Sequence, residues 1–498
     1  MKKSLFCFFL LSSFYTYAVS SKLEVYLKER EEALVLNQAF SFDSKLFLSP
    51  QEKQVNDYLE NLKNKLIASY RKKGTIPFSQ NFLLNKNTVF ENDLFLFIKK
   101  MPKGSLLHVH SGAFLKSEWI IKELTTLPDC YVYWLDDGVF LKGTFHFYEK
   151  NAVPHGFVSV SNLRANSPDF DKILLSLLEM EKKESSSSNL WEKFENWFQR
   201  IGGLIHYTPG FIKYYKYAME TLIEDNLQYM EVRALNIPVY NLDGSIEPPE
   251  KNIELYLQVR KEIQKKHPYF DFKIIHTEFR NLSQDQALQK LEFAYFLRSL
   301  YPSFVIGYDL VGEESLEQST LRFVDVFLEG QTVFEKKYKV DLPYYFHNGE
   351  SSWAYNKNLF DTVLLKSKRI GHALNLFNFP YLMEKIKQQD ICIEVCPISN
   401  QVLGYVPDLR MHPASGYLKA GIPCVISSDD SGMFGYHGTS PDLWEAVLAW
   451  DLDLTSLKQL FINSIQYSGM SKEEKALAFE HWSKQWNVFI EESLKAIL

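Results

Sequence analysis

Eight short apolar runs alternate along the chain with longer segments in which apolar residues recur at helical spacing. Most runs end in polar residues, and segments such as 285–300 and 380–390 between them have helical periodicity. The eight runs cover residues 104–112, 227–234, 272–280, 303–314, 344–352, 369–374, 391–400 and 423–432. Eight alternating units predict an α/β fold, a parallel (β/α)₈ barrel of the TIM-barrel type.

The polar residues at the ends of these runs are candidate functional residues. In a (β/α)₈ barrel the carboxyl ends of all strands surround one mouth, so side chains far apart in the sequence meet there. Residues of this kind end runs one, five, six and eight: His108, His110, His347, Glu350, His372, Asp429 and Asp430. We therefore expect them in a single cluster.

The segment before the barrel has a different pattern. Residues 21–95 mix charges with apolar positions at helical spacing, and Ser49-Pro50-Gln51-Glu52 has the form of a helix start. This segment is a candidate dimerisation region; packing within the same chain is the alternative. The barrel is predicted over 96–498, with a surface insertion of short strands and turns at about 120–190.

Residues 1–20 resemble a secretory signal peptide: two lysines, an apolar stretch, and small residues near Ala18 to Ser20. An uncleaved anchor or a buried helix is the alternative. No later apolar run has the length of a membrane span. We therefore expect a secreted or periplasmic protein without a stable membrane anchor after cleavage.

Composition further limits the class of protein and its partners. The 498 residues are 46% hydrophobic, which suits a large core, and the formal net charge is −6. No basic cluster is visible, so a nucleic acid is not an expected partner. Besides Cys7 the chain has only four cysteines, too few for a disulfide framework at this length, and buried thiols are expected.

The chemistry of the cluster points to a metal. In a strand, residues i and i+2 share a face, so His108 and His110 present two imidazoles side by side. Three or four histidines with an aspartate suit a zinc-like ion that acidifies water. Glu350 is then placed as a general acid, and His372 as a group that orients or accepts a proton. One of the adjacent aspartates would bind metal and the other substrate.

Several longer motifs carry a family resemblance. "MPKGSLLHVH", "GYDLVGEE", "FHNGESSW", "RIGHAL", "IEVCPISNQVL" and "VISSDDSGMFG" together resemble the adenosine deaminases, in particular the secreted adenosine deaminase growth factor branch. The resemblance extends over essentially the whole chain. It implies a zinc-dependent hydrolase that converts adenosine or 2′-deoxyadenosine to the inosine product and ammonia, and a homodimer.

The resemblance also implies roles at each matching position. One Zn²⁺ would be held by His108, His110, His347 and Asp429, the last counting among the catalytic residues too. Glu350 would protonate the purine N1, and His372 would steer the attacking hydroxide. Substrate contacts would come from Asp430 at the purine N7, the Gly312 backbone at N3, and Trp191 and Trp353 near the nucleoside.

Some positions depart from the family pattern. Ser111 and Gly112 stand where an aspartate is common, and Asn348, Ala373 and Ser431 replace the usual residues of their motifs. None of these changes removes a ligand or proton carrier. The predicted insertion contains only Cys130, so the disulfide of the secreted branch cannot form there. Two alternatives remain open: a deaminase of another aminopurine or a nucleotide, and a secreted binding or growth-factor-like protein with weak activity.

Overall fold

The computed structural model describes residues 5–180, 190–351 and 353–497, without the side chains of 5–20. The predicted signal peptide at residues 1–20 falls on the part whose side chains are not described, and residues 1–4 of it lie outside the described residues. The last part of the predicted insertion, 181–189, also lies outside them. Among the described residues, no helix combines the length and the apolar character that crossing a membrane requires.

The barrel predicted from the eight runs is confirmed. In the described part of the chain, eight parallel strands form two four-stranded sheets, ordered β1-β5-β6-β7 and β8-β9-β10-β11. Parallel bridges Tyr308–Tyr344 and Val109–Asp429 join the two sheets at both edges and close the ring. The strands are β1 (Gly104–His110), β5 (Leu227–Ala234), β6 (Asp271–Phe279), β7 (Val305–Val311), β8 (His347–Asn348), β9 (Arg369–His372), β10 (Cys392–Val395) and β11 (Cys424–Ile426).

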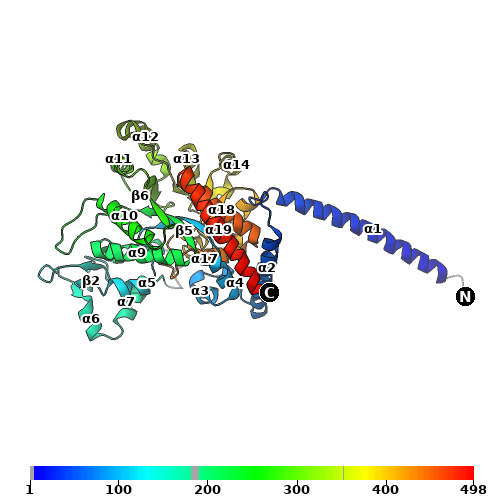
Figure 1. Ribbon diagram of the computed structural model, residues 1–498, viewed down its shortest axis with the longest axis horizontal. Helices are drawn as coiled ribbons and strands as arrows, with labels where there is room; N and C mark the ends of the chain where they lie inside the picture. Colours follow the sequence, from blue (N-terminus) through cyan, green and yellow to red (C-terminus); the bar gives the residue numbers. More distant parts are fainter. Residues whose placement is uncertain (1–4, 181–189, 352, 498) are drawn as a thin grey trace.

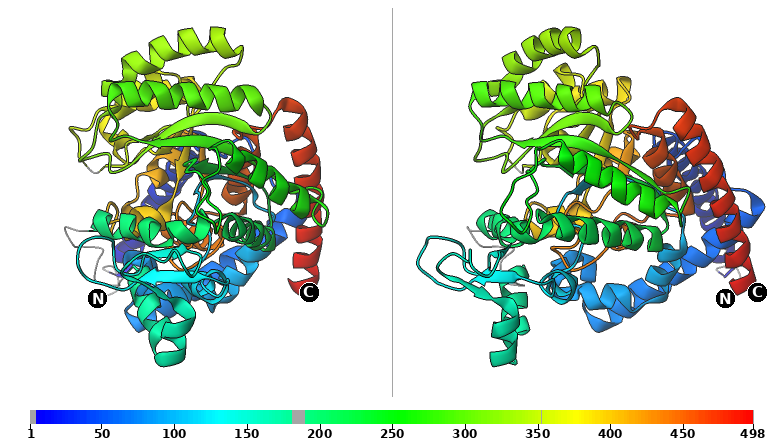
Figure 2. Two further views of the ribbon diagram at one scale, coloured as in Figure 1. Left: turned by 90° about the vertical axis from the view of Figure 1, so that its left-hand side faces the viewer. Right: turned by 60° about the vertical axis from the view of Figure 1, so that its left-hand side comes forward.

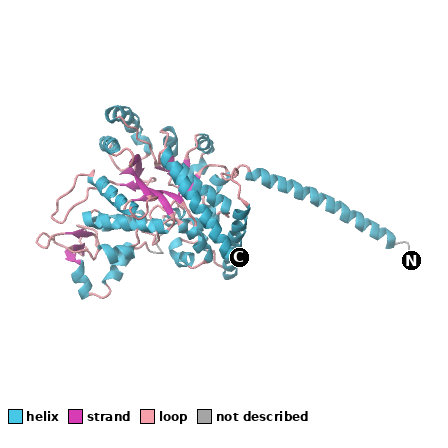
Figure 3. Ribbon diagram, viewed as in Figure 1, coloured by secondary structure: helices cyan, strands magenta, loops and turns pink. Residues whose placement is uncertain are grey.

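Helices surround these strands (Figure 2), and Figure 3 shows the strands enclosed at the centre. The strand residues are almost all buried, which explains why their sequences are continuous apolar runs rather than alternating ones. The helices that follow the strands are α9 (Thr208–Glu224), α10 (Lys251–Gln264), α11 (Gln284–Leu300), α12 (Val324–Tyr338), α13 (Asn358–Leu364), α14 (Pro380–Gln388), α15 (Pro397–Val402), α16 (Ala414–Lys419), α17 (Ser440–Ala449), α18 (Leu454–Gln466) and α19 (Lys472–Ile497).

Within the described residues, four α-helices precede the barrel: α1 (Leu5–Gln38), α2 (Pro50–Lys73), α3 (Phe82–Phe90) and α4 (Asp93–Lys100). The predicted start of α2 is confirmed, because Ser49 and Glu52 form a reciprocal capping box with Pro50 in the first turn. Buried Val55 and Leu59 pack α2 onto the barrel core. In contrast, α1 projects far from the rest of the molecule (Figure 1).

The insertion after β1 is a small antiparallel sheet in the order β3-β2-β4, standing apart from the barrel in Figure 3. Its elements are β2 (Cys130–Tyr133), β3 (Phe145–Phe147), β4 (Phe157–Ser159), α5 (Ser117–Trp119), α6 (Val160–Asn166) and α7 (Phe170–Leu178). The next helix, α8 (Leu190–Ile205), lies against β3 so closely that a Cβ on Gly203 would be 1.8 Å from the Phe145 carbonyl oxygen. The sheet therefore supports α8, which forms part of the wall above the barrel mouth.

Candidate active site

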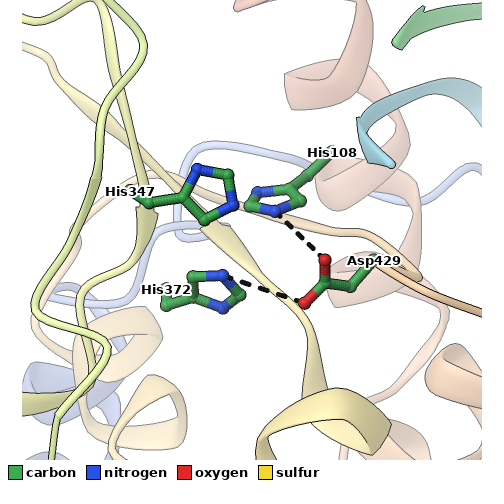
Figure 4. Close-up of side chains that lie close together, drawn as sticks. All are labelled: His108, His347, His372 and Asp429. Carbon is green, nitrogen blue, oxygen red and sulfur yellow. Dashed lines mark ion pairs between the residues drawn. The ribbon is translucent and has the colours of Figure 1, made fainter. Parts of the chain in front are cut away.

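The strand ends bring the predicted histidines and acids together. His108 and His110 lie on β1, His347 on β8 and His372 at the end of β9, while Asp429 follows β11. Four of these side chains face one another across the barrel mouth in Figure 4. The expectation of a single cluster is therefore met.

Asp429 is the centre of this cluster. Its Oδ1 lies 3.4 Å from His108 Nε2 and 3.1 Å from His110 Nε2, and its Oδ2 lies 3.8 Å from His372 Nε2. The Nε2 atoms of His110 and His347 are 3.1 Å apart. The side chains thus direct nitrogen and oxygen atoms into one small volume.

These residues fit a metal ion. His108, His347, His372 and Asp429 offer ligand atoms within 4.8 Å of one another, and His110, Asp429 and Asp430 form an overlapping group. Within the described part of the chain, the buried atoms His108 Nε2 and Asp429 Oδ1 have no hydrogen-bond partner despite their proximity. Buried polar atoms that converge without hydrogen-bonding fit a cation bound between them, and imidazole nitrogen with carboxylate oxygen suits zinc.

Two carboxylates that sequence reasoning missed accept hydrogen bonds from the histidines at Nδ1, the ring nitrogen on the side away from the cluster. Glu394 on β10 accepts a hydrogen bond from His108 Nδ1 at 2.8 Å, and Asp309 on β7 accepts one from His347 Nδ1 at 2.6 Å. A proton fixed on Nδ1 leaves the Nε2 lone pair of each ring free, as in carboxylate–histidine–zinc arrangements. Both histidines are therefore prepared as ligands.

The buried guanidinium group of Arg233 links these two carboxylates. Arg233 donates from Nε to Asp309 at 2.7 Å and pairs with Glu394 through Nη2, while Arg369 Nε donates to Glu394 at 2.6 Å. All four side chains are buried. The available signal was a charged residue at an interior position of an apolar strand, as in "MEVRA" and "ICIEV", because such a charge needs a partner.

Glu350 lies beside the cluster, with Oε1 3.6 Å from His372 Nε2. Its backbone is fixed by Glu314, which accepts hydrogen bonds from the N–H groups of Gly349 at 2.9 Å and Glu350 at 2.7 Å. Burial, followed by the nearby Asp429 charge, raises the pKa of Glu350 well above its usual value. Both effects favour the protonated form of this carboxyl group.

The backbone at the site is strained. His372 and Asp429 have φ values of +66° and +54°, and Ala373 has +50°, all in the left-handed region that non-glycine residues rarely adopt. Such strain persists only where the surrounding structure holds it, and it accumulates at functional sites. Here it turns the side chains at the ends of β9 and β11 into the mouth.

A cavity of about 480 Å³ opens over the cluster. Its lining includes Asp430, Gly312 and Trp191, three of the predicted substrate-contacting residues. Trp353, the fourth, does not line it and is 57% exposed. Gly312 has φ +124°, a backbone conformation that favours glycine and would be strained for any other residue.

Other polar residues in the runs have structural partners. His276 contacts Glu278 at 2.9 Å instead of facing the cavity. The buried His412 contacts Asn400, and the half-buried His437 contacts the Lys116 backbone. Among the departures from the family pattern, Ser111 lines the cavity. The four described cysteines are free and buried, Cys130 among them.

Comparisons with known proteins agree with this geometry. Residues 169–483 match the family model described as adenosine deaminase. Adenosine deaminase 2 from Sus scrofa is 33% identical, with 93% of this chain and 94% of that protein covered. Adenosine deaminase 2 from Homo sapiens is also 33% identical, with 97% and 96% covered.

Solved structures share the fold. The N6-mAMP deaminase of Arabidopsis matches with a TM-score of 0.58 at 17% identity, covering 78% of this chain and 99% of that one. An amidohydrolase from Burkholderia ambifaria with bound zinc also has a TM-score of 0.58, at 13% identity, covering 81% and 95%. From the family match and the full-length relatives, the chain belongs to the adenosine deaminase family, in the growth factor branch that includes the adenosine deaminase 2 proteins.

Proposed function

We propose that this protein is a zinc-dependent adenosine deaminase, which hydrolyses adenosine and 2′-deoxyadenosine to the inosine product and ammonia. The observation that carries the proposal is the cluster of His108, His110, His347 and Asp429, with Glu350 beside it at the barrel mouth. A binding protein with a decayed site is disfavoured, because the potential ligands and the acid are all present. The names of the full-length relatives support the same substrate.

His108, His110, His347 and Asp429 are the residues assigned to hold the metal. Zinc supplies a Lewis acid that lowers the pKa of water toward neutrality. The choice of zinc is supported by the nitrogen and oxygen donor set and by the bound zinc of the Burkholderia ambifaria structure.

The remaining roles belong to groups that move protons or hold the base. Glu350, whose protonated form is favoured by burial, donates its proton to the purine N1, which makes the adjacent C6 more electrophilic. His372 Nε2, 3.6 Å from Glu350, orients the attacking oxygen. Asp430 hydrogen-bonds the purine N7 and the Gly312 backbone meets N3; both residues line the cavity. Trp191, also in the lining, packs near the nucleoside.

The charges around the cavity favour a nucleoside over a nucleotide. Among the described residues that line it, Arg233 is the only lysine or arginine, and Asp309 and Glu394 already pair with it. Glu195 and Glu317 add negative charge. A phosphate recognised by this cavity would lack a cationic partner. The Arabidopsis structures with bound GMP and IMP are therefore a guide to the fold rather than to the substrate.

The N-terminal segments are assigned to export and assembly. Residues 1–20 act as the signal peptide of a secreted or periplasmic protein. The projecting α1 exposes Leu23, Tyr26, Leu27 and Leu34, the kind of apolar surface that marks an interface, and a homodimer through this region is proposed. Light scattering tests it: a mass of twice the mature chain is expected, and a monomer at micromolar concentration contradicts it.

The substrate is tested by incubating purified, zinc-loaded protein separately with adenosine and with AMP and following the ultraviolet absorbance. Adenosine is expected to be converted to inosine, with AMP converted far more slowly. Glu350→Gln is the control, since it keeps the shape but carries no transferable acid proton. Turnover of AMP over adenosine would contradict the substrate assignment.

A further inference from the structure

His372 differs from His108 and His347, the two other buried histidines of the cluster, in what holds its ring. His108 and His347 each meet a carboxylate at Nδ1, whereas His372 Nδ1 meets the side-chain amide of Asn400, with the nitrogen Nδ2 at 3.2 Å. Asn400 lies in α15, and its side chain is completely buried. An amide can offer either a donor or an acceptor, so its orientation decides where the proton of His372 resides.

The orientation of Asn400 follows from its other neighbour. Its Oδ1 lies 3.1 Å from His412 Nε2, and the backbone N–H of Ala414 donates to His412 Nδ1 at 3.1 Å. A main-chain N–H can only donate, so His412 Nδ1 is an acceptor and carries no proton. Burial lowers the pKa of His412 to about 3, so the ring is neutral and its single proton is on Nε2.

The hydrogen bonds then run in one direction. The Nε2–H of His412 donates to Asn400 Oδ1, which turns the NH₂ group of Asn400 toward His372. That group donates to His372 Nδ1, so the proton of His372 is on Nε2. There it faces Glu350 Oε1 at 3.6 Å and Asp429 Oδ2 at 3.8 Å.

We propose that Asn400 and His412 are positioning residues, which fix His372 as the Nε2–H tautomer through a hydrogen-bond chain that starts at the Ala414 backbone. An imidazole with a proton on Nε2 cannot bind a metal through that atom. The chain therefore separates His372, a donor toward the reacting groups, from His108 and His347, whose carboxylate partners leave Nε2 free. The role of the Nε2–H in catalysis rests on the proposed function, but the tautomer itself does not.

The decisive variant is Asn400→Asp, which is isosteric but presents only acceptors. The ¹⁵N spectrum of the ¹⁵N-histidine-labelled, zinc-loaded protein reports the tautomer, with the His372 signals assigned by their loss in His372→Gln. In the wild type, Nδ1 is expected to have the shift of an unprotonated nitrogen and Nε2 that of a protonated one. In Asn400→Asp the proton is expected on Nδ1. Asn87→Asp, on the exposed face of α3, is the matched control.

Kinetics give the second readout. With adenosine, Asn400→Asp is expected to lower kcat by roughly 10²-fold, as for loss of a positioned proton-transferring group, and to change KM far less. A wild-type His372 protonated on Nδ1, or an unchanged tautomer in Asn400→Asp, overturns the proposal. If the tautomers are as expected but adenosine is not deaminated, the positioning chain stands and the proposed function fails.

A second variant covers the case in which Asn400→Asp does not fold. His412→Phe removes the donor and keeps a ring against Trp450, whose centroid lies 5.2 Å from that of His412. Asn400 is then free to rotate, so a mixture of His372 tautomers is expected. A single Nε2–H tautomer in this variant refutes the part assigned to His412.

Discussion

Asp309 contacts both the buried ion network and the ring of His347, so Asp309→Asn is expected to weaken both folding stability and metal binding. Its carboxylate accepts four N–H groups: Oδ1 takes the backbone N–H of His347 at 2.9 Å and of Leu310 at 2.7 Å, and Oδ2 takes His347 Nδ1 at 2.6 Å and Arg233 Nε at 2.7 Å. An asparagine retains one acceptor oxygen. Its NH₂ group faces two of the four donors, which it cannot satisfy.

The size of the expected loss in stability follows from these contacts. Two buried N–H groups without acceptors cost roughly 1–3 kcal/mol each, and removing one partner of a buried ion pair costs about 3–5 kcal/mol. We expect the free energy of unfolding of the metal-free protein to fall by about 3–5 kcal/mol. Because His347 loses the group that orients its ring, zinc affinity should fall roughly 10–100-fold as well.

Urea unfolding of the metal-free protein measures the first effect, and competition with a chelator measures the second. Asp341→Asn is the matched control: its side chain is 73% exposed and pairs with Arg298 at 3.3 Å, so a change below about 1 kcal/mol is expected. If Asp309→Asn matched this control in stability and zinc affinity, the account of the buried network would be wrong.

Three further predictions test other parts of the site. Glu350→Gln should reduce kcat by roughly 10²–10⁴-fold with zinc content unchanged; a variant with near-normal kcat would remove Glu350 as the acid. Gly371→Ala places a Cβ 3.0 Å from His108 Cε1 and 3.3 Å from His347 Cα, so zinc affinity should fall at least roughly tenfold in chelator competition, and an unchanged affinity would contradict this packing. The folded-state pKa of about 3 at His412 lies below that of the unfolded chain, so stability due to this residue is lost as the pH falls from about 6.5 toward 3. Relative to His412→Phe, the metal-free wild type should lose up to about 1.4 kcal/mol per pH unit in urea unfolding, and parallel pH profiles would show that the residue does not titrate in this way.

The barrel and the cluster could be predicted because both depend on local pattern. A strand buried on both faces is a continuous apolar run, and its carboxyl end must lie at the mouth, so the histidines could be placed from position alone. Glu394 and Asp309 could not be placed in this way, because their partners lie on other strands. The only sequence feature that indicated this ion network was the presence of charged residues inside apolar runs.

The sequence pattern also did not predict which residues form the wall of the cavity. The helix α8 contributes Trp191 to the lining, yet its position depends on β3, whose Phe145 backbone it touches. Trp353 shows a similar limit: it lies close to "HNGE" in the sequence, yet its side chain is 57% exposed and does not line the cavity. The roles of the individual site residues remain predictions for the experiments above.

The most direct test of the central claim is adenosine turnover by one protein preparation before metal removal, after it, and after zinc is restored. We expect conversion to inosine at the start, its loss on chelation, and its return with about one zinc per chain, since the cluster surrounds one volume at Asp429. Folded protein that binds zinc at this cluster and leaves adenosine unchanged would contradict the claim. Undiminished turnover after complete metal removal would contradict it equally.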